Sequence, residues 1–118
     1  MAGLVNAGKN EMLDGFAGAV TFVSLHTADP STNGASEVSA SPYTREAVSW
    51  ATAASGSLSS ASSIVFDVPG STTINHLGYW SASTSGTFYG ARALDTAQTF
   101  ATVGTYTIAN GSITESIT

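Results

Sequence analysis

Apolar side chains recur at every second position in several short runs after residue 20, and this period constrains the fold more than any other feature. In SSIVFDV (62–68), Ile64, Phe66 and Val68 fall together, as on the buried face of a strand. Further runs with this period lie at 21–27, 43–51, 73–81 and 86–94. Short strands separated by frequent turns are typical of two-layer β proteins. The chain is therefore predicted to be mainly β, an antiparallel β-sandwich or jelly roll over residues 20–118.

Turn signals separate these runs. The polar loop 83–85 predicts a hairpin between the two runs that flank it. Pro69-Gly70 has the residue order of a type II turn, in which the glycine takes a positive φ. Asp95 stands three residues before Gln98 and is predicted to cap one short turn.

The last turn signal is Asn110-Gly111, the dipeptide that suits a type I′ hairpin. Such a hairpin would set Ile108 opposite Ile113 on adjacent strands. The same register would place Tyr106 opposite Glu115.

One short helix is predicted before the strands, over residues 4–17. Four apolar residues fall on one stripe of it: Val5, Met12, Leu13 and Phe16. Lys9 interrupts this stripe, so its aliphatic stem is expected to lie along the apolar face. Gly15 and Gly18 are expected to weaken and end the helix. A chain of 118 residues has room for one core, so residues 1–118 are predicted to form a single domain.

The charge content excludes several classes of partner. Charged residues make up 9% of the chain and the net charge is −5, with the basic residues Lys9, Arg45 and Arg92 far apart. Nucleic acid is not an expected partner, because phosphate backbones require clustered Lys and Arg. A membrane is not expected either, since no segment is apolar over the roughly 18 residues of a span. The N-terminus lacks a secretion signal, which predicts a protein made and used without secretion.

Neither of the motifs that could indicate chemistry is complete. GLVNAGKN (3–10) approaches a phosphate-binding loop, but it follows no strand and has Asn10 where that loop has a hydroxyl. His26 and His76 could join Asp29 or Asp67 in a metal or hydrolytic site, yet no ligand spacing links them. We predict structural roles for these residues, with His26 at a strand end. The sequence predicts no catalytic residue, no metal ligand and no cofactor.

Aromatic and basic side chains are the candidates for contact with other molecules. Four aromatic residues could form a sugar-stacking platform: Trp50, Tyr79, Trp80 and Tyr89. Alternation sets Tyr79 and Trp80 on opposite faces, so at least one should be in the core. Arg45 is expected to share a strand face with Tyr43, and Arg92 with Phe88, either as interface anchors or as solvated side chains stacked on a neighbour. The predicted interface residues are Lys9, Arg45, Tyr79 and Arg92.

Several segments together resemble a family of small structural proteins of tailed bacteriophages, which are named tail-fibre or minor tail proteins. The segments are LVNAGKNEMLDGFAG, VSLHTADPSTNGASEV, YTREAVSWA, FDVPGSTTINHLGYWSAS and GTFYGARAL, and the similarity runs from residue 4 to about residue 108. The resemblance implies a non-enzymatic protein located in the virion, after assembly in the host cytoplasm. It implies no catalytic residues.

Two positions in the virion are open to such a protein. The low charge, the small size and the lack of a fibrous repeat favour a capsid decoration (cement) protein, a homotrimer bound to the major capsid protein or other virion proteins. The alternative is a minor tail or tail-fibre tip protein that contacts host glycans.

Overall fold

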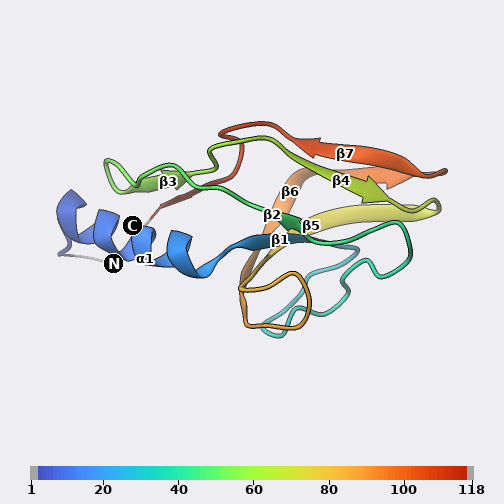
Figure 1. Ribbon diagram of the computed structural model, residues 1–118, viewed down its shortest axis with the longest axis horizontal. Coiled ribbons are helices and arrows are strands. Elements are labelled where there is room, and N and C mark those ends of the chain that lie inside the picture. Colours follow the sequence, from blue (N-terminus) through green and yellow to red (C-terminus); the bar gives the residue numbers. More distant parts are fainter. Residues whose placement is uncertain (1–2, 117–118) are drawn as a thin grey trace.

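The computed structural model describes residues 3–116, and within them the chain forms one helix and eight strands (Figure 1). These elements are α1 (Asn6–Ala19), β1 (Phe22–His26), β2 (Glu46–Ala47), β3 (Ser57–Ser59), β4 (Ile64–Val68), β5 (Thr72–Trp80), β6 (Phe88–Phe100), β7 (Gly104–Ile108) and β8 (Thr114–Ser116). The molecule is elongated, with principal extents of 47 × 26 × 23 Å.

The strands form two layers. One layer is a four-stranded antiparallel sheet in the order β2-β1-β5-β6, and the other consists of the antiparallel pairs β4–β7 and β3–β8. In Figure 1, β4 and β7 lie above β5 and β6, with α1 at the opposite end of the molecule. The predicted antiparallel β-sandwich with one short N-terminal helix is confirmed.

The core lies between the layers and follows the predicted alternation most clearly in β4. Ile64, Phe66 and Val68 are buried, whereas Val65 between them is exposed. β1 departs from this pattern, because four of its five residues are buried. The loop between β1 and β2 gives the reason, since its backbone bonds to the backbone of β1 and its Ala35 carbonyl bonds to the His26 side chain, on the face of β1 that points away from the core.

The prediction of a type I′ hairpin at Asn110-Gly111 is wrong. A turn is present, with Ser112 N–H donating to Ala109 O at 3.0 Å, but Gly111 has a φ of 80° whereas Asn110 keeps a negative φ. A type I′ turn needs a positive φ at both central residues. The chain therefore crosses from one strand pair to the other at this turn, and β7 and β8 separate.

The partners predicted for β7 and β8 are wrong for the same reason. Ile108 pairs with Ile64 of β4, and Glu115 pairs with Leu58 of β3. Ile113 is nevertheless buried in the same cluster as Ile108. The sequence thus placed both isoleucines in the core but not their strand neighbours.

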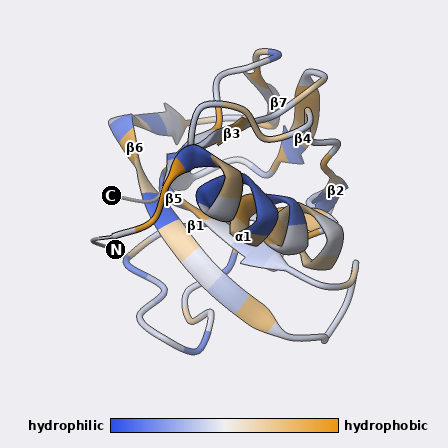
Figure 2. Ribbon diagram, turned by 90° about the vertical axis from the view of Figure 1, so that its left-hand side faces the viewer, coloured by the Kyte–Doolittle hydropathy of each residue, from blue (hydrophilic) through white to orange (hydrophobic). Residues whose placement is uncertain are grey.

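The helix differs from its predicted bounds and stripe. It begins at Asn6 and runs to Ala19, so Gly15 and Gly18, which were expected to weaken and end it, both lie inside it. Val5 is 72% exposed and Met12 is 47% exposed, and the interleaved hydrophilic and hydrophobic stretches along α1 are visible in Figure 2. Leu13 is buried, and two polar side chains fix the helix: Asp14 Oδ1 accepts from Ala53 N–H and Asn10 Oδ1 accepts from Gly56 N–H, both at 2.9 Å.

Three local predictions also need correction. The run 43–51 contributes only β2, and Trp50 beyond it forms an isolated bridge with Ser60. Asp95 lies within β6 and caps no turn, because β6 continues to Phe100.

At Pro69-Gly70, the positive φ of 55° belongs to Ser71, not to the glycine. Gly70 instead lies against the backbone of the loop after β6. A Cβ added to Gly70 would lie 3.1 Å from Thr102 Cα, so this close approach accounts for the glycine.

Candidate functional site

Arg45 fixes the long loop between β1 and β2 to the β5–β6 hairpin. Its Nε and Nη2 donate to the two carboxylate oxygens of Glu37 at 2.9 and 3.0 Å. Its Nη1 donates to the carbonyls of Ala82 and Ser85 at 3.1 and 2.8 Å. The Arg45 side chain is 9% exposed. Its hydrogen bonds are therefore used within the fold, and little of the guanidinium is left for the predicted interface role.

The indole of Trp80 lies directly under this ion pair. Arg45 Cζ lies 3.6 Å from the centroid of the Trp80 ring, a cation–π geometry. Phe88 also packs against this ring, with the two centroids 5.1 Å apart. The indole N–H donates to Ser24 Oγ at 2.8 Å. The loop, the hairpin and β1 are thus joined through one side chain.

Ser24 and His26 form the arrangement that most resembles catalytic chemistry. Ser24 Oγ lies 2.6 Å from His26 Nε2, and His26 Nδ1 lies 2.7 Å from Ala35 O. A carbonyl can only accept, so Nδ1 carries the proton and Nε2 accepts from the Ser24 hydroxyl. This is the spacing of a nucleophile and its base. Both residues are fully buried, so no substrate can reach Ser24 Oγ, and the pair holds the loop against β1.

Asp29 and His76 form no hydrogen bond with His26, although His76 lies directly opposite His26 across β1 and β5. Asp29 Oδ1 accepts from Ser31 N–H at 2.8 Å and organises the turn, as predicted from its position before Pro30. His76 Nδ1 lies 2.8 Å from Asn75 Oδ1. Within residues 3–116, no group of three or more His, Asp or Glu residues is arranged to hold a metal ion.

The burial of His26 predicts a pH-dependent stability. Desolvation lowers the pKa of His26 below the ordinary 6.5, and the Ala35 carbonyl and the Glu37 carboxylate oppose this only in part. The unfolded chain takes up a proton as the pH falls through 6.5, whereas the folded chain resists it. The stability that neutral His26 contributes is therefore present above pH 6.5 and is lost as the pH falls toward the lower folded pKa.

Urea unfolding between about pH 7.5 and about pH 5 should show this loss in the wild-type chain. His76→Gln should keep most of the loss, because burial remains the largest cause of the lowered His26 pKa and the Ser24–His26–Ala35 contacts stay intact, although His76 opposite it also lowers that pKa. His26→Gln should be less stable at both pH values and lose less on acidification than the wild type. An equal loss in His26→Gln would show that other groups are responsible.

Two of the predicted interface residues meet at Glu115 of β8. Tyr79 is buried in β5, and its hydroxyl donates to Glu115 Oε2 at 2.6 Å. Burial raises the pKa of Tyr79 above its ordinary range, and the adjacent carboxylate raises it further. Arg92 Nη1 donates to Thr114 O at 2.6 Å and lies 3.6 Å from Glu115 Oε2. The tyrosine is thus part of the interior, while Arg92 reaches from β6 to β8 at the surface.

Lys9 is the remaining predicted interface residue, and it lies on α1. A Cβ added to Gly56 would lie 3.1 Å from Lys9 Cδ. The lysine stem therefore packs against the turn before β3. It belongs neither to the Arg45 network nor to the contacts around Glu115.

The sugar-stacking platform that the sequence left open as an alternative is not formed by its four aromatic residues. Tyr79 and Trp80 are both buried, and Trp50 Nε1 donates to Val20 O at 2.9 Å from a half-buried position. Only Tyr89 among the four is exposed. A platform needs several exposed ring faces, so this alternative does not hold for these four residues.

The predicted pairing of Arg92 with Phe88 on one face is also wrong. The register of β6 shifts near its start, so that Phe88 lies opposite Trp80 and Arg92 lies opposite Leu77. Phe88 packs against Trp80 on the side covered by the loop, whereas Arg92 contacts β8. A β-bulge of this kind exchanges the faces of the residues beyond it.

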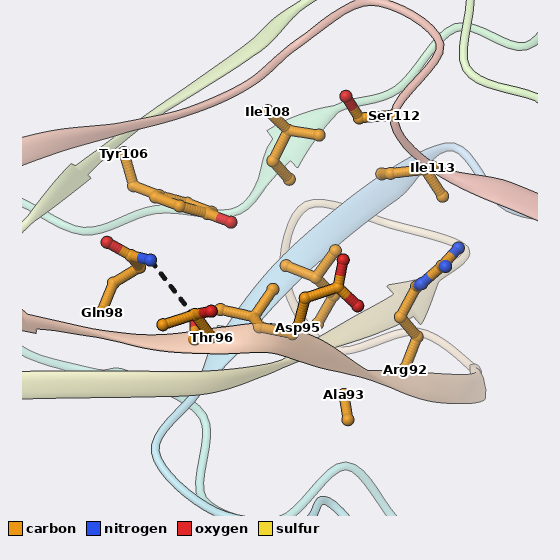
Figure 3. Close-up of a pocket in the computed structure, with 11 residues that line it drawn as sticks. Arg92, Ala93, Asp95, Thr96, Gln98, Tyr106, Ile108, Ser112 and Ile113 are labelled. Carbon is orange, nitrogen blue, oxygen red and sulfur yellow. Dashed lines mark hydrogen bonds between the residues drawn. The ribbon is translucent and has the colours of Figure 1, made fainter.

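The structure adds surface hollows that the sequence did not predict, among them two lined by residues of β6. The first, which we call the β6–β7 cleft, has a volume of about 300 Å³ and is shown in Figure 3. It is lined by Leu77, Arg92, Ala93, Leu94, Asp95, Thr96, Gln98, Tyr106, Ile108, Ser112 and Ile113. The second, of about 390 Å³, lies between α1 and the start of β6 and is more apolar, with Met12, Phe16 and Tyr89 on its walls. Neither has a local sequence signature, because each joins segments far apart in the chain.

Comparison with known proteins gives the family. A family described as podophage GP4 fiber I protein gp80 matches residues 5–116, nearly the whole chain. No curated protein matches. No helix in the described part of the chain is long and apolar enough to cross a membrane. The match agrees with the tail-fibre resemblance of the sequence segments and places the protein in the virion. The chain belongs to the podophage GP4 fiber I protein gp80 family.

Proposed function

We propose that the chain is a non-enzymatic structural subunit of a phage tail fibre, and that it is not a capsid decoration protein. The observation that carries this proposal is the match to a fiber protein family over residues 5–116. It favours the tail-fibre alternative over the head position, which rested on low charge and small size.

The distribution of charge supports a role in protein contacts. Arg45 is paired with Glu37 and Arg92 with Glu115, so two of the chain's three basic side chains are already neutralised. Much of the remaining surface is Ser, Thr and Ala, and exposed apolar residues include Val5, Met12, Val65, Tyr89 and Val103. The centres of protein interfaces are depleted of charge. In this proposal residues 1–118 act as one domain, which binds other virion proteins and further copies of itself, as a homotrimer.

The closed Ser24–His26 pair supports the non-enzymatic part. Both side chains are fully buried, and the Ser24 oxygen is also bonded to the Trp80 N–H. A reacting group would have to displace the covering loop, which the Arg45–Glu37 ion pair fixes. The pair is therefore suited to holding the loop.

Deletion of the gene from the phage tests the fibre position. Particles without the protein should adsorb to host cells far less than wild-type particles, while their heads release DNA at the same temperature. Supplying the protein should restore adsorption, and so should a Ser24→Ala variant that circular dichroism shows to be folded. If instead heads without the protein release DNA at a lower temperature and adsorb normally, the capsid decoration role is correct.

A further inference from the structure

The β6–β7 cleft has the size and construction of a small-ligand site. Its volume of about 300 Å³ lies at the lower end of the range for such pockets. Leu77, Ile108 and Ile113 are buried residues that give it an apolar base. In Figure 3, Tyr106 projects from β7 above the β6 residues, while Asp95 and Arg92 point up from β6 on the side of the cleft where Ile113 lies.

A large bulge in β6 shapes one wall of the cleft. Ile74 of β5 pairs with Gln98, and His76 pairs with Ala93, so the four residues 94–97 face only Asn75. Bulges commonly change the direction of side chains next to binding sites. This bulge, which is separate from the register shift near the start of β6, brings Asp95 and Thr96 to the cleft.

The bulge also bears on which partner the cleft can take. β6 is the outer strand of its sheet, and outer strands can pair with a strand of another chain. Such pairing requires a continuous row of backbone groups. Residues 94–97 interrupt that row in the middle of β6, so the edge is poorly suited to an added peptide strand.

The polar groups of the cleft are free to bind. Within residues 3–116, the side chains of Asp95, Tyr106 and Ser112 form no hydrogen bond, although all three line the cleft. Burial raises the pKa of Tyr106, and the Asp95 carboxylate raises it further, so the phenol remains a donor at neutral pH. Gln98 Nε2 donates to Thr96 O, which leaves the Gln98 carbonyl as an acceptor.

The charges in the cleft do not favour an anion. Arg92 is its only cation among the lining residues, and it is bonded to Thr114 O and lies 3.6 Å from Glu115 Oε2. Asp95 adds an uncompensated negative charge. A ligand with a carboxylate or phosphate would therefore meet repulsion that the neutralised arginine does little to offset.

We infer that the β6–β7 cleft binds a neutral, hydroxyl-rich ligand, namely a unit of a saccharide. Hydroxyl groups can donate to Asp95 and can accept from the Tyr106 and Ser112 hydroxyls. The C–H face of a sugar ring can pack on the apolar base. The inference goes beyond the proposed structural role. Only the suggestion that the bound saccharide belongs to a host glycan rests on the proposed tail-fibre function.

NMR titration of the isotope-labelled full chain tests this site. The probes are the methyl glycosides of glucose, galactose, mannose, rhamnose and N-acetylglucosamine, each at concentrations that saturate a millimolar site, with inorganic phosphate and a short alanine-rich peptide for comparison. At least one glycoside should shift the amide resonances of residues 92–98, 106 and 112–113. Asp95→Asn and Tyr106→Phe should each weaken this binding about tenfold.

A matched control is Asp67→Asn, because Asp67 is an exposed aspartate on β4 that does not line the cleft. It should bind as the wild type does. Absence of shifts with every glycoside, or stronger shifts with phosphate or the peptide, would overturn the inference. Because the titration uses the isolated protein, absence of binding would overturn the saccharide site but not the tail-fibre position. Conversely, finding the protein on the head would overturn the tail-fibre position but not a measured saccharide site.

Discussion

Arg45→Ala is expected to lower the free energy of unfolding by about 3–5 kcal/mol, because it leaves the mostly buried Glu37 carboxylate without its cation. The substitution also removes two hydrogen bonds to hairpin carbonyls and the cation that covers the Trp80 ring. Tyr43 would remain as a donor to Glu37, at 2.7 Å, but a single phenol cannot compensate a carboxylate charge. Denaturant unfolding followed by Trp fluorescence measures the effect.

Two further variants make this result specific. Arg92→Ala removes a cation that is 35% exposed and should cost no more than about 1 kcal/mol. Arg45→Lys should recover only part of the loss, since an ammonium cannot bind both carboxylate oxygens in the fork geometry. Equal effects of Arg45→Ala and Arg92→Ala would contradict the role assigned to Arg45.

Gly78→Ala is the second substitution expected to have a large effect, about 3 kcal/mol or more, through overpacking and loss of buried hydrogen bonds. Gly78 pairs with Ser24 across β1 and β5. A Cβ added there would lie 2.6 Å from His26 Nε2 and closer still to Ser24 Oγ. Either side chain could move only by breaking the Trp80–Ser24–His26 chain of hydrogen bonds.

Gly15→Ala provides the matched glycine control. Gly15 lies in α1, and a Cβ there would meet nothing within 4 Å. Alanine should therefore stabilise the chain by about 0.5–1 kcal/mol through its higher helix propensity. If Gly78→Ala unfolds at the same denaturant concentration as the wild type, the tight packing around Ser24 is not important for stability.

The parts of the fold that the sequence predicted depend on local patterns. The alternation of Ile64, Phe66 and Val68 and the polar loop 83–85 each lie within a few residues. The structure confirms β4 as an alternating strand and β5–β6 as an antiparallel hairpin. The partners of β7 and β8 could not be predicted in this way, because they depend on contacts with segments about 40 to 60 residues earlier in the chain.

The candidate site was harder to predict for a related reason. Ser24 and His26 have the spacing of a solvent-facing pair on β1, and nothing local shows that a loop covers them. Arg45 resembled an interface anchor because its partner Glu37 and its carbonyl acceptors lie outside its own run. The bulge at 94–97 likewise has no signature in the sequence, since Asp95 also suited a helical cap.

The position of the protein in the particle tests the central claim most directly. Gold-labelled antibody fragments raised against the folded chain can be bound to intact phage and located by electron microscopy. If the chain is a tail-fibre subunit, the gold should lie on the fibres, with few copies per particle and none on the head. Gold spread in many copies over the surface of the head would contradict the account.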